Sequence, residues 1–432
     1  MKLVERLAAI WTSVESPFLI YGDKQLHFAD LQAEANPALE QVRPGDVVAL
    51  IGDFDPVSIL SLLRLIDLGA IIVPVTIETT HEHDYFFETA LVDLVVQGKS
   101  VRRREHNSKH PLIEGLRAKG HPGLVLFSTG TTGRPKAILH DLSLFIKRFE
   151  TPRPTLKAIS FLLFDHIGGI NTLLHTLFNK GVVVAPPART VDAILDSCAK
   201  HKVEVLPTSP TFLRMMLMSG AVPMRIPACI KVITYGTERM DEPTLDELCA
   251  LLPNVDFRQT FGMSELGILR VKSEARNSLF MRIGGEGVET RVVDNVLHVR
   301  SGTRMLGYLN AASPFDADGW YDSKDIVEFK EGGYYKVVGR VSDVINVGGL
   351  KFMASEVERA VLGFPGVNLV KVTARSNPIT GQHVELQVEA SEGVIIDQPS
   401  LMGYLNECLQ PHQVPKRIRF GKVDVSHRFK KS

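Results

Sequence analysis

Residues 124–136 read Leu-Val-Leu-Phe-Ser-Thr-Gly-Thr-Thr-Gly-Arg-Pro-Lys. An apolar run typical of a buried strand leads into hydroxyl side chains, two glycines and a closing lysine. Glycine lets the backbone approach an anion closely and turn its N–H groups toward it, and hydroxyls and a lysine add hydrogen bonds and charge. The segment is not a Walker A loop, because no Gly-Lys-Ser/Thr triplet ends it. We predict a phosphate-binding loop rather than an ordinary turn, made by Ser128, Thr129, Gly130, Thr131, Thr132 and Lys136.

Around this loop, apolar runs alternate with segments of helical spacing. The runs predict strands at Val47–Ile51, Ile71–Val75, Gly123–Phe127, Val182–Val184, Val203–Leu206 and Lys231–Thr234. The spacing predicts helices at Pro56–Leu68, Thr211–Met218 and Glu242–Leu251. Continuous buried strands alternating with helices indicate an α/β fold of layered, largely parallel sheets.

The texture changes toward the C-terminus. From about Gly284 the sequence becomes β-rich and is punctuated by glycines, which predicts a β-rich subdomain. The last block predicts a small α+β unit with helices at Ser355–Leu362 and Pro399–Leu409 and strands at Val367–Arg375 and His383–Ala390. We therefore expect a large N-terminal domain over residues 1–339 and a small, mobile C-terminal domain over residues 340–432.

The composition excludes several classes of protein. Lys plus Arg number 49 and Asp plus Glu number 49, so zero net charge gives no signature of a nucleic-acid or membrane-surface binder. No apolar run reaches the ~18 residues that a membrane span needs, and the N-terminus does not resemble a secretory signal. The four cysteines are widely scattered, which argues against a disulfide framework or a metal knuckle. We expect a cytoplasmic protein.

A second motif, Arg-Gln-Thr-Phe-Gly-Met-Ser-Glu, occupies residues 258–265 and follows a short apolar segment. Its position predicts the carboxyl end of a strand, where α/β sheets bind ligands. Phe261 offers a flat face to a purine, Ser264 a hydroxyl to a phosphate and Glu265 a hard oxygen ligand to Mg²⁺. Taken alone, a Phe-Gly turn in a core explains the motif equally well.

Further along, Gly-Trp-Tyr-Asp-Ser-Lys-Asp ends at Asp325, and Gly-Arg-Val-Ser-Asp begins at Gly339. Asp325 could accept hydrogen bonds from a ribose diol, and Arg340 could donate to the same sugar. Read singly, the first is more often a loop carboxylate and the second a solvated surface charge.

In combination, these motifs resemble one family. FSTGTTGRPK, FGMSE, SKD and GRVSDVINVGGLK occur in the order found in the AMP-forming acyl- and aryl-CoA synthetases. These belong to the adenylate-forming ANL superfamily, which also contains luciferases and nonribosomal-peptide adenylation domains. The resemblance runs from about Leu124 to the end, and the first hundred residues match only loosely.

The resemblance implies a nucleotide site. ATP phosphates would be held by the loop of residues 128–136 and by Ser264, and Mg²⁺ by Glu265. Adenine would lie between a backbone segment and Phe261, and the ribose would be held by Asp325 and Arg340. The remaining implied nucleotide-binding residues are Gly236, Thr237, Glu238 and Gly262.

The resemblance also implies a catalytic lysine near the C-terminus. An ungapped count from Phe420 places it on Lys431, whereas a slip of one residue places it on Lys430; a solvated basic tail is the alternative. His166 matches the residue that gates the acyl pocket and the thiol tunnel, although a lone histidine among apolar residues is usually a core residue. Ser342 falls on the pivot between the domains. The family's Thr-Gly-Asp has become Ser-Lys-Asp here, so a glycine is replaced by Lys324.

The implied activity is an acid–CoA ligase. A carboxylic acid attacks the α-phosphate of MgATP to give an acyl-adenylate and pyrophosphate, and the thiol of CoA then takes the acyl group. A second possibility is a stand-alone adenylation enzyme that loads a carrier protein's phosphopantetheine arm, with Asp165 as a candidate partner for an amino acid's ammonium group. A third is a non-catalytic nucleotide-binding homologue.

Overall fold

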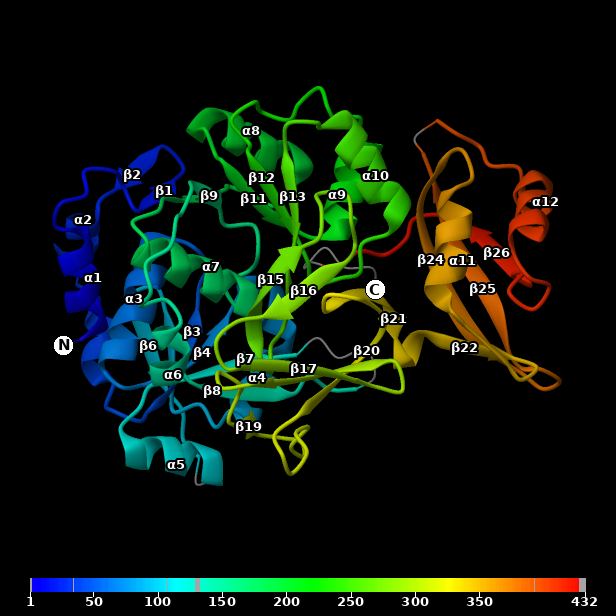
Figure 1. Ribbon diagram of the computed structural model, residues 1–432. Helices are drawn as coiled ribbons and strands as arrows, with labels where there is room; N and C mark the ends of the chain where they lie inside the picture. Colours follow the sequence, from blue (N-terminus) through cyan, green and yellow to red (C-terminus); the bar gives the residue numbers. More distant parts are fainter. Residues whose placement is uncertain (1, 34, 107, 129–132, 392, 427–432) are drawn as a thin grey trace.

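The computed structural model describes residues 2–33, 35–106, 108–128, 133–391 and 393–426. Within these ranges the strands form three seven-stranded sheets and one five-stranded sheet, with helices packed around them (Figure 1). The helices are α1 (Leu3–Trp11), α2 (Phe28–Ala33), α3 (Pro56–Asp67), α4 (His83–Thr89), α5 (Pro111–Lys119), α6 (Leu142–Lys147), α7 (Ile167–Phe178), α8 (Val191–His201), α9 (Pro210–Met218), α10 (Glu242–Leu251), α11 (Ala354–Leu362) and α12 (Gln398–Cys408). No helix of the described ranges has both the length and the apolar character to cross a bilayer.

The first sheet carries the predicted phosphate loop. In spatial order its strands are β19 (Gly307–Tyr308), β8 (Ala137–Asp141), β7 (Gly123–Phe127), β4 (Ile71–Val75), β3 (Val47–Ile51), β5 (Leu94–Gln97) and β6 (Ser100–Arg103). Strands β7, β4, β3 and β5 run parallel, and β4 and β7 are buried along their whole length. A strand covered on both faces needs an unbroken apolar sequence, which is why the bounds of β3, β4 and β7 match the predicted ones.

The second sheet is also mainly parallel. Its strands are β13 (Asp256–Gln259), β12 (Val232–Tyr235), β11 (Val205–Thr208), β9 (Ala158–Ile159), β10 (Val183–Ala185), β1 (Leu19–Tyr21) and β2 (Lys24–Leu26). The prediction of a strand at Val203–Leu206 was two residues early. The backbone N–H of Val203 still bonds to the carbonyl of Cys198 at the end of α8, and strand pairing starts only at Val205.

The third sheet is antiparallel and corresponds to the predicted β-rich region. Its strands are β14 (Phe261–Met263), β15 (Gly267–Ser273), β16 (Met281–Gly284), β21 (Tyr334–Arg340), β20 (Tyr321–Lys330), β18 (Val296–Ser301) and β17 (Val288–Val293). It begins at Phe261, earlier than the expected change near Gly284, because the FGM segment pairs with β15. The second motif therefore starts on β13 of the second sheet and continues onto β14, an edge strand of this sheet.

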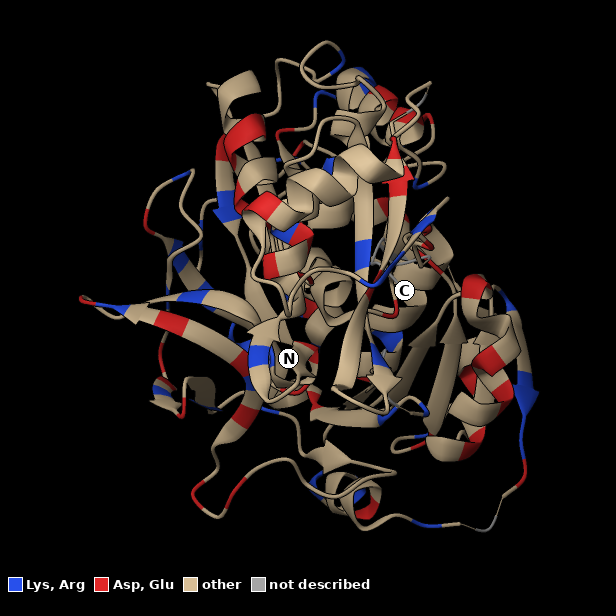
Figure 2. Ribbon diagram, turned by 90° about the vertical axis from the view of Figure 1, so that its right-hand side faces the viewer, with Lys and Arg blue, Asp and Glu red and all other residues tan. Residues whose placement is uncertain are grey.

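The fourth sheet lies at the right of Figure 1, with α11 and α12 beside it. Its strands are β23 (Leu350–Met353), β22 (Val344–Val347), β25 (Gly381–Ala390), β24 (Val367–Asn377) and β26 (Arg417–Phe420). These strands and the two helices enclose a hydrophobic core of their own, between Ile345 and Ile418. The domain boundary at residue 340 stays a prediction. Seen from this side, acidic and basic residues are interspersed over the elements (Figure 2).

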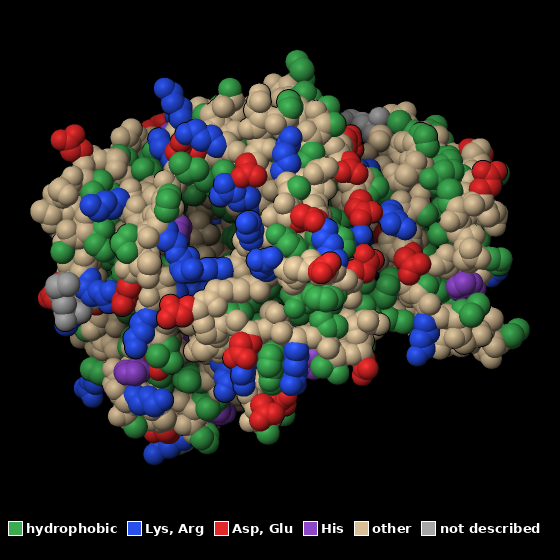
Figure 3. All heavy atoms as spheres, in the orientation of Figure 1, with side chains coloured by type: hydrophobic (Ala, Val, Ile, Leu, Met, Phe, Trp, Pro, Cys, Tyr) green, Lys and Arg blue, Asp and Glu red, His purple; other side chains and the backbone are tan. Residues whose placement is uncertain are grey.

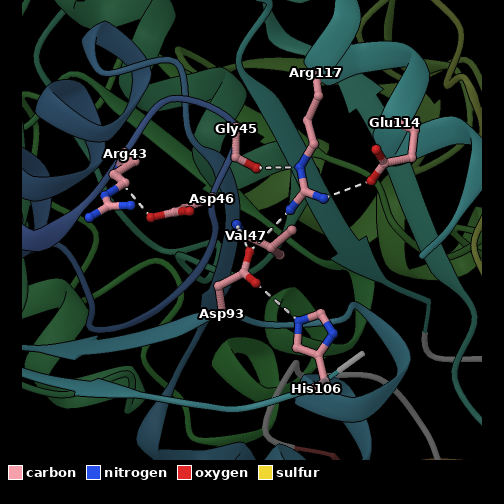
Figure 4. A network of polar contacts seen from close by, with 8 residues as sticks. All are labelled: Arg43, Gly45, Asp46, Val47, Asp93, His106, Glu114 and Arg117. Carbon is pink, nitrogen blue, oxygen red and sulfur yellow. Dashed lines mark hydrogen bonds and ion pairs between the residues drawn. The ribbon is translucent and has the colours of Figure 1, made fainter. Parts of the chain in front are cut away.

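A network of partly buried hydrogen bonds and ion pairs connects the first sheet to α5 (Figure 4). The Asp93 carboxylate accepts hydrogen bonds from the backbone N–H of Val47 (2.8 Å) and from Arg117 Nη2 (3.2 Å), and His106 Nε2 lies 3.1 Å away. Arg117 Nε also donates to the carbonyl of Gly45 at 2.8 Å. Since backbone groups at the start of a buried strand need partners, this network holds the end of β3 that lies away from the phosphate loop.

Candidate active site

The base of the predicted phosphate loop is closed by a reciprocal pair of hydrogen bonds. The backbone N–H of Ser128 donates to the carbonyl of Lys136 at 3.0 Å, and the backbone N–H of Lys136 donates to Ser128 Oγ at 3.1 Å. The strand-to-loop transition predicted after Phe127 is therefore present. Thr129, Gly130, Thr131 and Thr132 lie outside the described residues, so their contacts with phosphate stay a prediction.

Glu265 is buried and is held by a tyrosine from a distant part of the chain. Tyr308 Oη donates to Glu265 Oε1 at 2.7 Å, and Lys136 Nζ lies 4.9 Å from the centre of the Tyr308 ring. Burial, together with the Glu265 carboxylate, raises the pKa of Tyr308 well above its usual range, so the phenol stays protonated and donates. The fold thus brings the loop lysine and the motif carboxylate to one tyrosine.

The backbone of the second motif is anchored by a histidine. His140, on β8, is buried, and its Nε2 donates to the carbonyl of Ser264 at 2.6 Å. Burial lowers the pKa of His140 to about 4, so the ring is neutral at pH 7 and keeps this N–H for the bond. The first and third sheets are joined at this point, directly beside Glu265.

The segment predicted to face adenine follows β12 and lies against the end of β13. The backbone N–H of Thr260 donates to the carbonyl of Tyr235 at 2.7 Å, and a Cβ on Gly236 would lie 2.1 Å from Thr260 Oγ1. Glycine is therefore required at 236. Thr237 adopts φ +70°, which is unusual for a β-branched residue and is typical of functional sites. Glu238 accepts a hydrogen bond from Thr211 Oγ1 at 2.7 Å.

Phe261 and Gly262 lie just beyond this junction, on β14. A Cβ on Gly262 would lie 2.7 Å from the carbonyl oxygen of Gly267 on the neighbouring strand, so the close approach of β14 and β15 needs glycine. Two predicted adenine-binding segments, residues 236–238 and 261–262, thus meet where β12 and β13 end.

Asp325 and Arg340 face one another on β20 and β21. Their Cα atoms are register partners, and Arg340 Nε donates to Asp325 Oδ1 at 3.0 Å. Burial raises the pKa of the Asp325 carboxyl, and the Arg340 guanidinium offsets part of that rise. The reading of Asp325 alone as a loop carboxylate was wrong, because it is a buried strand residue; Arg340 is exposed, as expected of a surface charge, and is its partner.

Lys324 occupies a left-handed position, the conformation that glycine adopts most readily. Its φ is +62°, and an L-residue in this region costs about 1–2 kcal/mol. We expect Lys324→Gly to raise the free energy of unfolding by ~0.5–1 kcal/mol, after allowing for the greater entropy of unfolded glycine. Urea titration measures this. Lys351→Gly, a matched change in the extended strand β23, should destabilise instead; stabilisation of both variants or of neither would contradict the backbone argument.

The other predicted residues fall at three places. His166 caps the N-terminus of α7, where its Nδ1 accepts a hydrogen bond from the N–H of Gly168 at 3.0 Å, and the preceding Asp165 is buried. Ser342 lies in the exposed turn between β21 and β22. Lys431 and Lys430 lie outside the described residues. The contacts of α7 with β15 bring the helix that carries His166 to the strand that follows Glu265.

The arrangement fits a magnesium ion that shares its ligands with phosphate. Mg²⁺ in nucleotide enzymes is usually held by one or two carboxylates together with phosphate oxygens rather than by a protein cage. The described residues contain no cluster of three or more His, Cys, Asp or Glu side chains suited to a metal, and Glu265 presents a single oriented carboxylate near Lys136. Sequence reasoning missed His140 and Tyr308, because no local motif marks either residue.

A model of the family described as AMP-binding enzyme matches residues 9–315. The chain belongs to this family. It is an AMP-binding enzyme of the AMP-forming ligase class, which argues against the non-catalytic alternative. The family match includes the first two motifs and most of the N-terminal region that resembled the family only loosely.

This AMP-binding enzyme is similar in sequence to several CoA and carrier-protein ligases. It is 25% identical to feruloyl-CoA synthase of an Amycolatopsis species, over 88% of this chain and 85% of the relative. It is 22% identical to 4-coumarate–CoA ligase-like 5 of Oryza sativa subsp. japonica, over 88% and 77%. It is 26% identical to the fatty acid–[acyl-carrier-protein] ligase ScoC of Streptomyces coeruleorubidus, over 69% and 63%.

Solved structures agree on the fold. The anthranilate CoA ligase AuaEII with anthranoyl-AMP superimposes with a TM-score of 0.81 at 18% identity, over 99% of this chain and 94% of that one. The o-succinylbenzoate CoA synthetase of Bacillus subtilis with its acyl-adenylate gives 0.78 at 19% identity, over 99% and 96%. The predicted mixed α/β fold is confirmed.

Proposed function

We propose that this enzyme uses ATP to activate a carboxylic acid as an acyl-adenylate, releases pyrophosphate, and transfers the acyl group to the thiol of CoA, with AMP as the leaving group. The single observation that carries the proposal is that Tyr308 contacts both Lys136, at the end of the phosphate-loop motif, and the carboxylate of Glu265. The names of the CoA ligases among the relatives support CoA as acceptor. The carrier-protein ligase among them supports the alternative acceptor, a phosphopantetheine arm.

In this proposal the protein works by positioning and electrostatics. The barrier to attack at the α-phosphate is chiefly the crowding of negative charge, so oriented donors and cations lower it. Lys136 and the loop residues hold the phosphates, and Ser264 donates to the α-phosphate. Glu265, fixed by Tyr308, holds the magnesium ion, which when bound screens the phosphate charge.

The adenine would be held by residues 236–238 and 261–262, and the ribose by Asp325 and Arg340. Gly236, without a side chain, lets the 236–238 segment lie flat beside adenine, and Phe261 covers the other face. The paired Asp325 and Arg340 offer an acceptor and a donor to the ribose hydroxyls. Their mutual hydrogen bond orients both side chains before the sugar arrives.

We further propose that residues 1–339 and 340–432 are the two domains and that the described arrangement serves the adenylation step. Two features support this. The turn containing Gly348 and Gly349, which in this proposal lines the thiol path in the second step, is exposed, and nothing lies within 4 Å of the Cβ position of either glycine. Beyond β26, the red segment in Figure 1 runs back toward the large domain.

One arginine of the large domain forms hydrogen bonds with the C-terminal unit. Arg214, on α9, has a side chain only 13% exposed. Its Nε donates to the carbonyl of Asn368 (2.9 Å) and its Nη2 to that of Val367 (3.0 Å), both at the start of β24 in the C-terminal unit. Glu242, on α10, adds a contact to Arg359 on α11 (3.5 Å) and is itself paired with Lys336 of the large domain.

Arg214→Met should therefore slow adenylation selectively. Loss of two charge-assisted hydrogen bonds should lower the occupancy of this arrangement and reduce the rate of pyrophosphate release by about 10-fold. Thioester formation from a supplied acyl-adenylate should be unchanged or faster. Single-turnover assays of the two half-reactions measure the ratio.

The matched control is Arg276→Met, because Arg276 donates to the carbonyls of Cys249 and Leu252 wholly within the large domain. This change should lower stability without altering the ratio of the half-reactions. Equal slowing of both half-reactions by Arg214→Met would show that the contact is only structural.

The proposed function itself is tested by a pyrophosphate-release screen across carboxylic acids. With one class of acid, we expect ATP-dependent pyrophosphate release that hydroxylamine traps as the hydroxamate, and an acyl thioester when CoA is added. Thioester formation only with a phosphopantetheinylated carrier protein would select the alternative acceptor. Absence of pyrophosphate with every acid would overturn the proposal.

A further inference from the structure

Three arginines gather where α6, α7 and β15 meet. Arg148 follows α6, and one of its nitrogens donates to the carbonyl of Ile268 on β15. Arg153 Nη2 lies 3.4 Å from the carbonyl oxygen of Arg148, and Arg270 lies further along β15. The Arg148 guanidinium also lies over the ring of Phe145, 5.2 Å from its centre. Positive charge is thus concentrated on one side of the third sheet.

These charges have no carboxylate partners. Among the described residues, no Asp or Glu oxygen lies within 4 Å of a side-chain nitrogen of Arg148, Arg153 or Arg270, and Arg148 Nη1 is buried with no hydrogen-bond partner. By contrast, Arg225 contacts both Asp192 and Asp196. A buried donor without a partner is costly, and a bound anion would supply an acceptor at this cluster.

The three charges also act on one another. Burial, together with Arg153 and Arg270, lowers the pKa of Arg148 to about 10. Burial and Arg270 lower the pKa of Arg153, while burial and Arg153 lower that of His175 on α7. Like charges held this close repel, and a bound anion would relieve that repulsion.

The cluster adjoins the site; Arg270 is exposed, and Arg148 and Arg153 are half-buried. Figure 3 shows a hollow left of centre with Lys and Arg side chains gathered along its rim; in the same orientation, Figure 1 has α7 and β15 at this place. Ile268, whose carbonyl accepts a hydrogen bond from Arg148, lies three residues beyond Glu265, across the turn that joins β14 to β15. A ligand that reaches Glu265 with one end can therefore reach the arginines with the other.

We propose that Arg148, Arg153 and Arg270 form an anion site that binds a carboxylate, sulfonate or phosphate group carried by a substrate away from its reacting carbonyl or thiol. The inference rests on the proposed function and deepens it, because it gives one substrate a second anionic group. Guanidinium groups suit this role, since their planar N–H donors match two oxygens at once. The anion belongs either to the acid or to the phosphates of CoA.

The experiment compares matched substrates in the full-length enzyme and in Arg153→Gln and Arg270→Gln. In the absence of CoA, pyrophosphate release is measured with octanoate against octanedioate and with 3-phenylpropanoate against 4-(2-carboxyethyl)benzoate. In the thioester step, CoA is compared with pantetheine. Arg225→Gln is the control, because Arg225 has its own acidic partners outside the cluster.

If the acid carries the anion, kcat/KM for the diacids should fall about 10- to 100-fold in both variants, while the monoacids are unaffected. If CoA carries it, KM should rise by a similar factor for CoA and not for pantetheine. The inference would be overturned if the variants preferred diacids over monoacids, and CoA over pantetheine, as strongly as the wild type does. It would also be overturned if kcat/KM fell equally for all substrates.

A binding readout separates this inference from the proposed function. Inorganic sulfate should raise the Tm of the wild-type protein more than chloride at equal ionic strength, and Arg148→Met and Arg270→Gln should lose that difference. If the wild-type enzyme releases pyrophosphate but shows neither the sulfate effect nor substrate discrimination, the inference fails and the function stands. If sulfate binds at the arginines but no acid is activated, the function fails and the anion site stands.

Discussion

Replacement of Lys431 by alanine is expected to reduce pyrophosphate release from ATP and acid by about 10²- to 10³-fold, the cost of removing one preorganised donor from a developing oxyanion. Thioester formation from a supplied acyl-adenylate should be nearly unchanged, because charge no longer develops at an attacked phosphorus in that step. Rapid-quench measurement of each half-reaction tests both statements. The role of Lys431 comes from the ungapped count along the tail.

Lys430→Ala is the companion variant. If the count is one residue too long, Lys430→Ala loses adenylation and Lys431→Ala does not. If both variants adenylate normally, the tail holds no catalytic lysine, and the assignment of the described arrangement to adenylation fails with it. Wild-type thermal stability in both variants would show that the change is catalytic.

Glu265→Gln should be the most damaging change among the described residues, lowering kcat/KM for ATP by about 10²-fold and raising the Mg²⁺ concentration needed for half-maximal rate. Glutamine can still accept the hydrogen bond of Tyr308, so the local structure should survive while the charge is lost. Initial rates at varied Mg²⁺, with unfolding measured in parallel, separate the two effects. Glu286→Gln, an exposed change of the same kind, is the control.

Tyr308→Phe completes the comparison. It removes only the donor that fixes the carboxylate. We therefore expect kcat/KM for ATP to fall about 10-fold and the Mg²⁺ requirement to rise, but by less than in Glu265→Gln. An unaltered Mg²⁺ requirement in Glu265→Gln would remove Glu265 from the metal site. A loss in Tyr308→Phe as large as that in Glu265→Gln would mean that the phenol itself contacts substrate.

Much of the fold could be predicted because its central strands are covered on both faces. Such strands must be apolar at every position, so the runs at β3, β4 and β7 showed their limits in the sequence itself. The start of β11 was misplaced because Val203 is as apolar as the strand, and only its bond to the end of α8 excludes it. The antiparallel sheet was placed too late because β14 is short and rich in functional residues.

The candidate site was predictable to the extent that its chemistry needs particular residues in a row. A phosphate loop needs glycines and hydroxyls together, and Gly236 is required where two chain segments touch. Residues that contact the motifs from distant parts of the chain lie in no motif of their own. Tyr308 lies 43 residues from Glu265, and His140 lies 124 residues from Ser264.

The sequence by itself determined the family, the α/β layering and the motif residues, because each depends on side chains close together along the chain. Only the tertiary structure decided which tyrosine orients Glu265, that Asp325 is buried against Arg340, and that Arg214 joins the two units. It also decided that Arg148, Arg153 and Arg270 share one place without a carboxylate. The physical reason is that burial and electrostatic pairing are properties of surroundings assembled from separate elements, and adjacency in sequence does not encode them.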